Sequence, residues 1–306
     1  MANSLLFKSL VAYQFTQPYL FDALVLEEKL QAQRFSGCGE QDISSYGWAP
    51  ALGKHSTALV HEADGCFLIC AAHEEKIIPP AVIAELLEER IDEIEAREDR
   101  KVFSKERRQI RDDILITLLP RAFSKKKYTL AYIDQNNGLL MVNASTFNQA
   151  ELLTSHLRQS LGSLPVTNPN VKWPPAVPLT DWLGGQSASP WFELGDTCEL
   201  REPGDEGGTI IVRNEDLTSE EIAQHLQSGK QVSNLAVTWK DQLSVKLCDD
   251  LRMTNLKFTG QFNEKLDEIE SDNYEQYQDA TFRIMAGTLA GFMKDHRTAF
   301  GWKAES

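Results

Sequence analysis

The residues best suited to chemistry in this chain are the cations between Arg97 and Lys127. This segment carries eleven basic and five acidic residues, a local charge of +6, within 306 residues whose net charge is −14. Lysine and arginine attract phosphate groups and displace counterions from a nucleic-acid backbone. Because the distribution of charge matters more than its sum, an acidic chain can still present a surface that attracts polyanions. The segment permits such a surface without proving one.

Two groups of cations stand out within this segment. On one continuous helix, four of them form a stripe at spacings of four, four and three residues: Arg97, Lys101, Lys105 and Arg108. A turn near residue 103 would split this stripe, and Glu93 is placed to pair with Arg97, so a solvated, salt-bridged helix end explains the stripe equally well. The run Lys125-Lys126-Lys127 has no nearby acids, and phosphate contact is favoured there over a role in solubility alone.

Other chemistry is weakly represented in the sequence. Cys66, Cys70 and His73 have C-x₃-C-x₂-H spacing, but structural zinc sites present a second pair of ligands, and this segment otherwise predicts a core strand. The pair Asp249-Asp250 offers carboxylates for a divalent cation, yet neighbouring strand residues point to opposite faces. The sequence Gly37-Cys38-Gly39 lacks a third glycine, and no nucleophile or phosphate-loop motif is present. We therefore predict no metal site, no cofactor and no enzymatic activity.

The composition predicts a soluble globular protein. Hydrophobic residues make up 42% and charged residues 25% of the chain. No apolar run approaches the roughly 18 residues needed to span a bilayer. Residues 1–15 predict a first strand rather than a signal peptide, because they lack a cleavage site of small residues. The scattered, odd-numbered cysteines suit reduced thiols. We expect a cytoplasmic protein with no membrane partner.

The cationic segment lies in a helical region between strand-forming segments. Residues 80–119 predict helix, because Pro80 suits a first turn and apolar residues recur at spacings of three and four. We interpret this region as two antiparallel helices that project from the rest of the chain, with a turn near Phe103–Ser104. One long helix is the alternative. Residues 127–143 predict a β-hairpin that turns at Asn137–Gly138.

Prolines mark the main division of the chain, since residues 165–178 hold five of the twelve. We predict a central α+β domain from residues 1–79 and 120–166, a helical tip at 80–119, and a second α+β domain at 167–306. The mixture of strand runs and helix runs predicts an α+β fold with mixed or antiparallel sheets and flanking helices.

Several segments are similar to the bacterial RdgC family of recombination-associated proteins. They are GWAPALG at 47–53, EEKIIP at 74–79, LLPRAFSK at 118–125, LRQSLGSLPV at 157–166, DLTSEEI at 216–222 and LAVTW at 235–239. Their order matches the family, and the resemblance spans nearly the whole chain. None of these segments is a catalytic motif, but their combination is specific.

This resemblance implies a curved, multi-domain subunit and a ring-shaped homodimer that encircles double-stranded DNA. The family binds duplex DNA with little sequence preference, restrains the RecA recombinase in recombination and replication, and associates with the nucleoid. It has no known enzymatic activity or cofactor. A ring that is acidic outside and basic within would reconcile the net charge with DNA binding. Whether RecA is contacted directly or only excluded from DNA stays open.

The resemblance also points to particular residues. Lys76 and Arg121 match family positions on the DNA surface, and Arg213 lies where the family carries a basic residue near the hole. Lys125–Lys127 depart from the family, which has fewer consecutive lysines here. We expect the DNA-binding residues to be Lys76, Arg121, Lys125, Lys126, Lys127, Arg213, Arg97 and Lys101.

Phe123 receives two different interpretations. The sequence pattern alone favours burial in its own domain, whereas the family segment LLPRAFSK implies a contact between subunits. Two other functions compete with DNA binding. A protein-interaction adaptor would use the helical tip to recognise a partner, and a metal-dependent nuclease would need convergent carboxylates that the sequence does not reveal.

Overall fold

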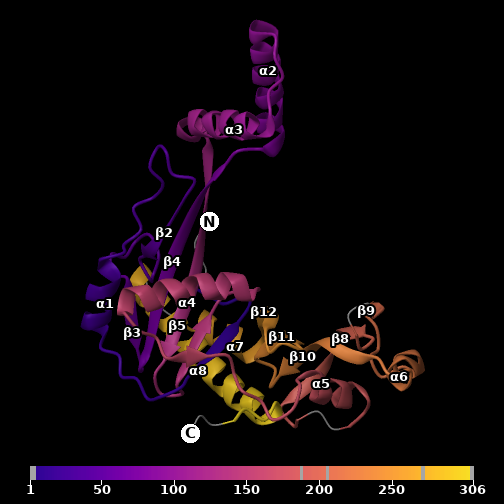
Figure 1. Ribbon diagram of the computed structural model, residues 1–306. Helices are drawn as coiled ribbons and strands as arrows, with labels where there is room; N and C mark the ends of the chain where they lie inside the picture. Colours follow the sequence, from indigo (N-terminus) through magenta and orange to yellow (C-terminus); the bar gives the residue numbers. More distant parts are fainter. Residues whose placement is uncertain (1–4, 187–188, 205–206, 270–272, 304–306) are drawn as a thin grey trace. The chain divides into compact units, whose positions relative to one another are not determined.

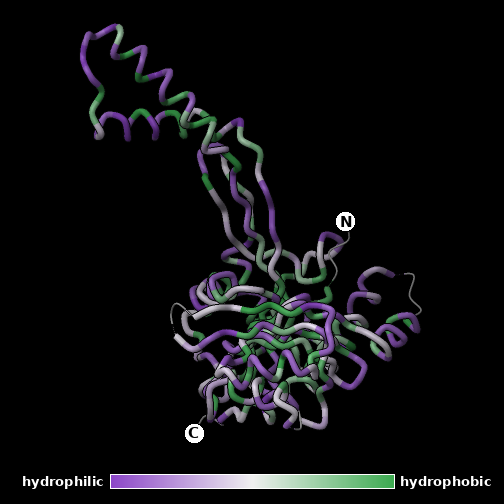
Figure 2. Tube along the Cα trace, turned by 90° about the vertical axis from the view of Figure 1, so that its right-hand side faces the viewer, coloured by the Kyte–Doolittle hydropathy of each residue, from purple (hydrophilic) through white to green (hydrophobic). Residues whose placement is uncertain are grey.

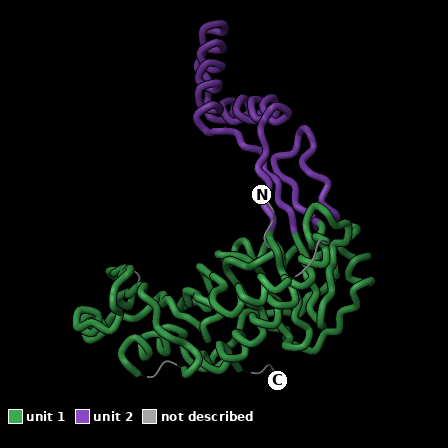
Figure 3. The backbone as a smooth tube through the Cα atoms, turned by 180° about the vertical axis from the view of Figure 1, so that it is seen from behind, with its two compact units in different colours: residues 1–32, 50–70, 129–306 green, residues 33–49, 71–128 purple. Residues whose placement is uncertain are grey.

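The computed structural model describes residues 5–186, 189–204, 207–269 and 273–303. Helices and two antiparallel sheets make up this part of the chain, which confirms the predicted α+β fold class (Figure 1). Contacts divide the chain into two compact units (Figure 3). Unit 1 comprises residues 1–32, 50–70 and 129–306, and unit 2 comprises residues 33–49 and 71–128. The domain boundary expected at residue 167 stays a prediction.

The first sheet has the strand order β2-β4-β5-β6-β1-β7, with β3 paired to β4. Its strands are β1 (Val11–Phe15), β2 (Ser44–Ala49), β3 (Val60–Ala63), β4 (Cys66–Ile77), β5 (Phe123–Asp134), β6 (Leu139–Val142) and β7 (Val166–Thr167). β4 and β5 are long strands that pass through both units. All residues of β1 and β6 are buried, and Gln14 is the one polar residue among them.

The predicted hairpin at Asn137–Gly138 is confirmed. β5 pairs antiparallel with β6, and Asp134 lies opposite Leu139 at the end of the ladder. The Asp134 carboxylate accepts hydrogen bonds from the backbone N–H of Asn137 at 3.0 Å and from its side-chain amide at 2.7 Å. Gly138 has a φ of 63°, the left-handed conformation that this turn requires. β5 begins at Phe123, four residues before the predicted start of the hairpin.

The second sheet lies wholly in unit 1 and has the order β12-β11-β10-β8-β9. Its strands are β8 (Phe192–Arg201), β9 (Thr209–Arg213), β10 (Gln231–Trp239), β11 (Leu243–Cys248) and β12 (Met253–Phe258). Unit 1 also contains helices α1 (Ala23–Gln31), α4 (Phe147–Leu161), α5 (Ala176–Leu183), α6 (Glu220–Gln227), α7 (Gly260–Asp267) and α8 (Tyr274–Ala299). Phe292 of α8 contacts the rings of Phe192 and Trp239, which anchors the helix to this sheet.

Unit 2 contains two helices in the predicted helical region, α2 (Pro80–Glu98) and α3 (Ser104–Leu118), followed by the short 3₁₀ helix η1 (Leu119–Arg121). The alternative of one long helix is therefore wrong. Asp99 ends α2 in the left-handed conformation, with a φ of 49°. The helices pack through a small apolar cluster around Leu87, Ile91 and Ile110. The axes of the two helices are inclined to each other (Figure 1). Hydrophobic and hydrophilic residues alternate along both helices (Figure 2).

Close contact with residues 33–35 explains why the GWAPALG segment begins with a glycine, Gly47. The N–H of Phe35 donates to the carbonyl of Trp48 at 2.8 Å, and the N–H of Trp48 donates to the carbonyl of Gln33 at 3.0 Å. These bonds hold residues 33–35 against β2. A Cβ on Gly47 would lie 2.7 Å from the Cα of Phe35, which is closer than packed atoms approach.

We therefore expect Gly47→Ala to destabilise unit 2 by roughly 1–3 kcal/mol, because the added methyl group forces the two segments apart. Urea unfolding measures the loss, and hydrogen exchange of residues 33–49 locates it. Gly287→Ala is the matched control, since a Cβ there meets nothing within 4 Å inside helix α8. Unchanged exchange of residues 33–49 in Gly47→Ala would contradict this account.

Candidate nucleic-acid interface

Five of the expected DNA-binding residues lie in one part of unit 2, where β4 ends and where η1 leads into β5. We call this set the β-ribbon cations: Lys76, Arg121, Lys125, Lys126 and Lys127. The two strands are neighbours in the first sheet, so the sheet brings together residues about 50 positions apart in the sequence. The five cations differ in their surroundings, which decides how freely each can meet a phosphate.

On one face of the strand pair β4–β5, Glu74 interacts with side chains of β5. The hydroxyl of Ser124 donates a hydrogen bond to its carboxylate, and the Nζ of Lys126 lies 3.7 Å from the same group. The hydrogen bond from Ser124, aided by the charges of Lys126 and Lys76, holds the pKa of Glu74 below its usual range. The ammonium of Lys126 also lies 4.7 Å from the ring centre of Phe35. Lys126 therefore already has internal partners.

The opposite face carries the free cations. Alternate residues of a strand face opposite sides, so Lys125 and Lys127 lie on the face away from Lys126 and Glu74. Both are exposed, and neither has a carboxylate within 4.0 Å among the residues that the structure describes. Arg121 is likewise exposed at the end of η1, with no ion pair in the described part of the chain. These three side chains can bind phosphate without losing an internal partner.

Lys76 is half-buried in β4, and its backbone N–H donates to the carbonyl of Ile43 at 2.8 Å. Its side chain shares the face of Glu74, whose pKa it helps to lower. Lys76 therefore interacts with Glu74 on this face of the strands. A phosphate bound on the same face would compete with Glu74 for interaction with the Lys76 ammonium group.

The cations at the end of α2 are paired, as the salt-bridged interpretation of this stripe proposed. Arg97 lies 2.8 Å from Glu98, and Lys101 lies 2.7 Å from Glu95. The expected partner of Arg97, Glu93, pairs instead with Arg90 at 2.6 Å. Exposed ion pairs of this kind contribute little to stability, typically about 0–1 kcal/mol.

Helix α3 carries exposed cations that are not among the expected DNA-binding residues. Lys105, Arg108 and Arg111 are exposed at spacings of three residues and have no ion pair among the described residues. Lys105 and Arg108 appeared in the sequence as part of one stripe with Arg97, which requires a continuous helix. The helix is broken at residues 99–103, but Lys105 and Arg108 remain neighbours on α3 because they are three residues apart in the sequence.

Arg213 does not belong to this group. It ends β9 in unit 1, where its side chain is exposed, and it is followed by Asn214 in the left-handed conformation with a φ of 55°. Its expected role beside DNA stays a prediction.

Phe123 is 86% exposed, so the expectation of burial within its own domain is wrong. The physical reason is its position at the start of β5, whose first six residues all lie outside the sheet core. Strand alternation places Phe123 on the same face as Ile77, which is 50% exposed at the end of the neighbouring β4. Both are exposed apolar side chains on the face that also carries Lys125.

The cysteines and carboxylates considered for metal binding do not belong to a metal-binding group in the described part of the chain. Among the described residues, no group of three or more His, Cys, Asp and Glu side chains is placed to hold a metal ion. Cys66 and Cys70 are buried in β4, and burial raises the pKa of each thiol to about 12. Asp250 accepts a hydrogen bond from Arg252 at 2.7 Å. No helix in the described ranges has both the length and the apolar character needed to cross a membrane.

Comparisons with known proteins agree on one family. A family model described as "Putative exonuclease, RdgC" matches residues 5–303. A Tolumonas auensis protein named "Recombination-associated protein RdgC" is 41% identical over 295 residues, which cover 96% of this chain and 98% of that protein. Proteins of the same name from Salmonella typhimurium and Salmonella newport are 37% identical over 299 residues, 98% of this chain and 99% of their own. By this near-complete coverage, the chain belongs to the RdgC family.

Proposed function

We propose that this protein binds double-stranded DNA through the phosphate backbone, without reading sequence, and acts in recombination. The observation that carries the proposal is that Arg121, Lys125 and Lys127 of unit 2 are exposed and have no carboxylate partner among the described residues, in a chain of net charge −14. Contacts to phosphate position a protein on DNA but carry no sequence information. The name shared by its relatives supports the link to recombination.

The proposal extends to assembly and partners. Two subunits form a ring around the duplex, associate with the nucleoid, and modulate RecA by direct contact or by competition for DNA. A basic lining inside an acidic ring focuses the field on the phosphates, so a few cations suffice. The exposure of Phe123 and Ile77 on one face of the strands supports a subunit contact near the free lysines, because a contact there would remove both apolar side chains from water.

Binding to closed circular and linear duplexes of equal length at matched salt tests the proposal. After a challenge with high salt, an encircling ring is expected to stay on closed circles and to slide off linear ends. Equal release from both substrates would remove encirclement from the proposal. Absence of binding at moderate ionic strength, or binding indifferent to salt, would overturn DNA binding itself.

The helix pair favours one alternative, a protein-interaction adaptor. Phe103, between α2 and α3, is 74% exposed, and the preceding cations Arg100 and Lys101 are already paired with glutamates. Charge reversal of Arg121 and Lys125–Lys127 separates the two functions. Our proposal expects loss of DNA binding, whereas DNA binding that survives while partner binding is lost would favour the adaptor.

The family description names an exonuclease, so nuclease activity has to be tested directly. We propose that the protein has no enzymatic activity. Linear duplex labelled at its ends and incubated with the purified protein and Mg²⁺ is expected to stay intact. Mg²⁺-dependent release of nucleotides that EDTA abolishes would contradict this part of the proposal.

Phe123→Ser is expected to weaken the homodimer while leaving the subunit folded. The side chain is 86% exposed in the single chain, so its removal should change subunit stability by less than about 0.5 kcal/mol. Sedimentation velocity across a concentration series measures dimerisation, and thermal unfolding checks the fold. Phe103→Ser is the matched control, an exposed phenylalanine in the same unit. Equal dimerisation of both variants would place the interface elsewhere.

A further inference from the structure

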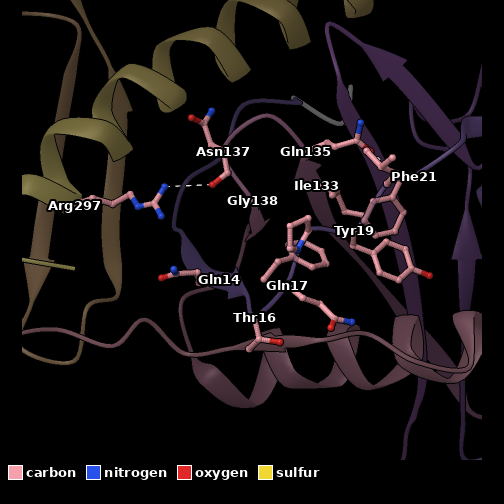
Figure 4. Close-up of a pocket in the computed structure, with 13 residues that line it drawn as sticks. Gln14, Thr16, Gln17, Tyr19, Phe21, Ile133, Gln135, Asn137, Gly138 and Arg297 are labelled. Atoms are coloured by element: carbon pink, nitrogen blue, oxygen red, sulfur yellow. Dashed lines mark hydrogen bonds between the residues drawn. The ribbon is translucent and has the colours of Figure 1, made fainter. Parts of the chain in front are cut away.

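Unit 1 contains a pocket of about 490 Å³ to which the proposed function gives no role (Figure 4). Its walls come from residues 14–21 at the end of β1, from Ile133, Gln135, Asn137 and Gly138 around the β5–β6 turn, and from Arg297 near the end of α8. The volume falls in the range of small-molecule sites, roughly 300–1,000 Å³. All of these residues lie in unit 1, so the pocket belongs to one compact body.

One end of the pocket is aromatic. Tyr19 lies 4.6 Å from Phe21 and 6.3 Å from Phe15, measured between ring centres. The side-chain carbonyl of Gln135 accepts a hydrogen bond from the backbone N–H of Phe21 at 2.6 Å, which holds the loop in place. Tyr19 and Phe21 are half-buried and keep part of their ring surface exposed. A rigid aromatic wall of this kind can stack against a flat ring.

The other end of the pocket is cationic (Figure 4). A guanidinium N–H of Arg297 donates to the carbonyl of Asn137 at 3.2 Å, and the group lies 5.5 Å from the ring centre of Trp302. Among the described residues, no carboxylate lies within 4.0 Å of Arg297 to form an ion pair. The nearby Asp134 carboxylate is occupied by Asn137. Burial lowers the pKa of Arg297, because the charge is partly removed from water, and the charge of Asp134 offsets this only in part.

The remaining wall also favours an anion. Among the described residues, neither Asp nor Glu lines the pocket. A neighbouring cavity of about 230 Å³ shares Arg297 and adds Lys294. Gln14, only 4% exposed, has a side-chain carbonyl with no hydrogen-bond partner among the described residues. A buried acceptor without a partner is unfavourable until a donor reaches it.

We infer that this pocket binds a nucleotide, with the base against Tyr19 and Phe21 and the phosphate on Arg297. An inorganic anion would leave the aromatic end unused, and an apolar ligand would leave the guanidinium unpaired, whereas a base joined to a phosphate uses both. Two sources share this chemistry, a free nucleotide and an unpaired nucleotide at the end of a DNA strand.

Calorimetric titration of the full-length protein with dAMP tests the inference without any duplex present. Wild type and Lys257→Gln, an exposed control outside the pocket, are expected to bind saturably. Arg297→Gln should bind at least about tenfold more weakly, since it loses charge-assisted hydrogen bonds, and Arg297→Lys should keep part of the affinity. Deoxyadenosine lacks the phosphate, so it should bind wild type and Arg297→Gln equally weakly. Tyr19→Leu should weaken both ligands.

A duplex with one unpaired terminal nucleotide, compared with a hairpin-capped duplex, identifies the source. A preference for the unpaired end that Arg297→Gln abolishes indicates a DNA strand, and dAMP binding without that preference indicates a free nucleotide. The inference is overturned by absence of saturable dAMP binding, by equal affinity for inorganic phosphate, by equal affinity of Arg297→Gln and Lys257→Gln, or by tighter binding of an acidic peptide. Failure to bind the hairpin-capped duplex would instead count against the proposed function.

Discussion

Replacement of Arg121, Lys125 and Lys127 together by glutamine is expected to weaken duplex DNA binding on the order of 100-fold at about 0.1 M salt. The three side chains are exposed and have no carboxylate partner in the described part of the chain, so their charge is available to phosphates. Each lost phosphate contact should also lower the slope of log affinity against log salt by about 0.9. Fluorescence anisotropy of a labelled duplex across a salt series measures both quantities.

The control for this variant carries the same change in net charge. Lys29, Lys172 and Lys257 are exposed lysines of unit 1, outside the β-ribbon cations. Their joint replacement by glutamine is expected to change affinity by no more than about threefold. If both triple variants lost affinity equally, general charge would account for binding and the ribbon would have no special role. Lys126→Gln alone should have a smaller effect than Lys125→Gln, because Lys126 already pairs with Glu74.

His296 is expected to make unit 1 sensitive to acid. Its side chain is 1% exposed and lies among the rings of Phe292, Phe300 and Trp302, with ring centres 4.4–5.8 Å away. Burial lowers the pKa of His296 to about 3, since removal from water disfavours the charged imidazole. An unfolded histidine has a pKa of about 6.5. Between these values the unfolded chain binds a proton that the folded chain excludes.

The contribution of His296 to stability is therefore complete above a pH of about 6.5 and is lost as the pH falls toward 3. Linkage gives a loss of about 2 kcal/mol between pH 7.5 and pH 5. His296→Phe keeps an aromatic ring but cannot titrate, and the Nδ1 that it removes has no hydrogen-bond partner among the described residues. We expect this variant to lose about 2 kcal/mol less than wild type over that interval in urea unfolding. An exposed histidine of the same unit, changed in His55→Phe, provides the control. Parallel pH profiles for wild type and His296→Phe would contradict the assignment.

Much of the framework follows from local sequence signals. Asn137–Gly138 predicts its hairpin because that pair adopts the tight turn readily, and Pro80 predicts the start of α2 because its missing N–H costs nothing there. The break between the two helices is less evident in the sequence. Residues 95–109 have few large apolar side chains, and Asp99 ends α2 without a glycine or proline.

The ion pairs of the candidate interface were harder to predict. Spacing alone paired Arg97 with Glu93, but on the folded helix Arg97 reaches Glu98 and Glu93 reaches Arg90. Side chains of this length reach several neighbours at similar cost, so spacing does not select among them. The consequence is functional, because a paired cation and a free one differ in their readiness to bind phosphate.

By itself, the sequence determined the α+β class, the local charge of +6 between Arg97 and Lys127, and membership of the RdgC family. Only the tertiary structure decided which cations are free, that Phe123 is exposed, and that residues 14–21 meet Arg297 in one pocket. The physical reason is the range of the contacts involved. Turns, helix starts and charge density depend on neighbours in the chain, whereas a partner such as Glu74 for Lys126 depends on strands brought side by side by the sheet.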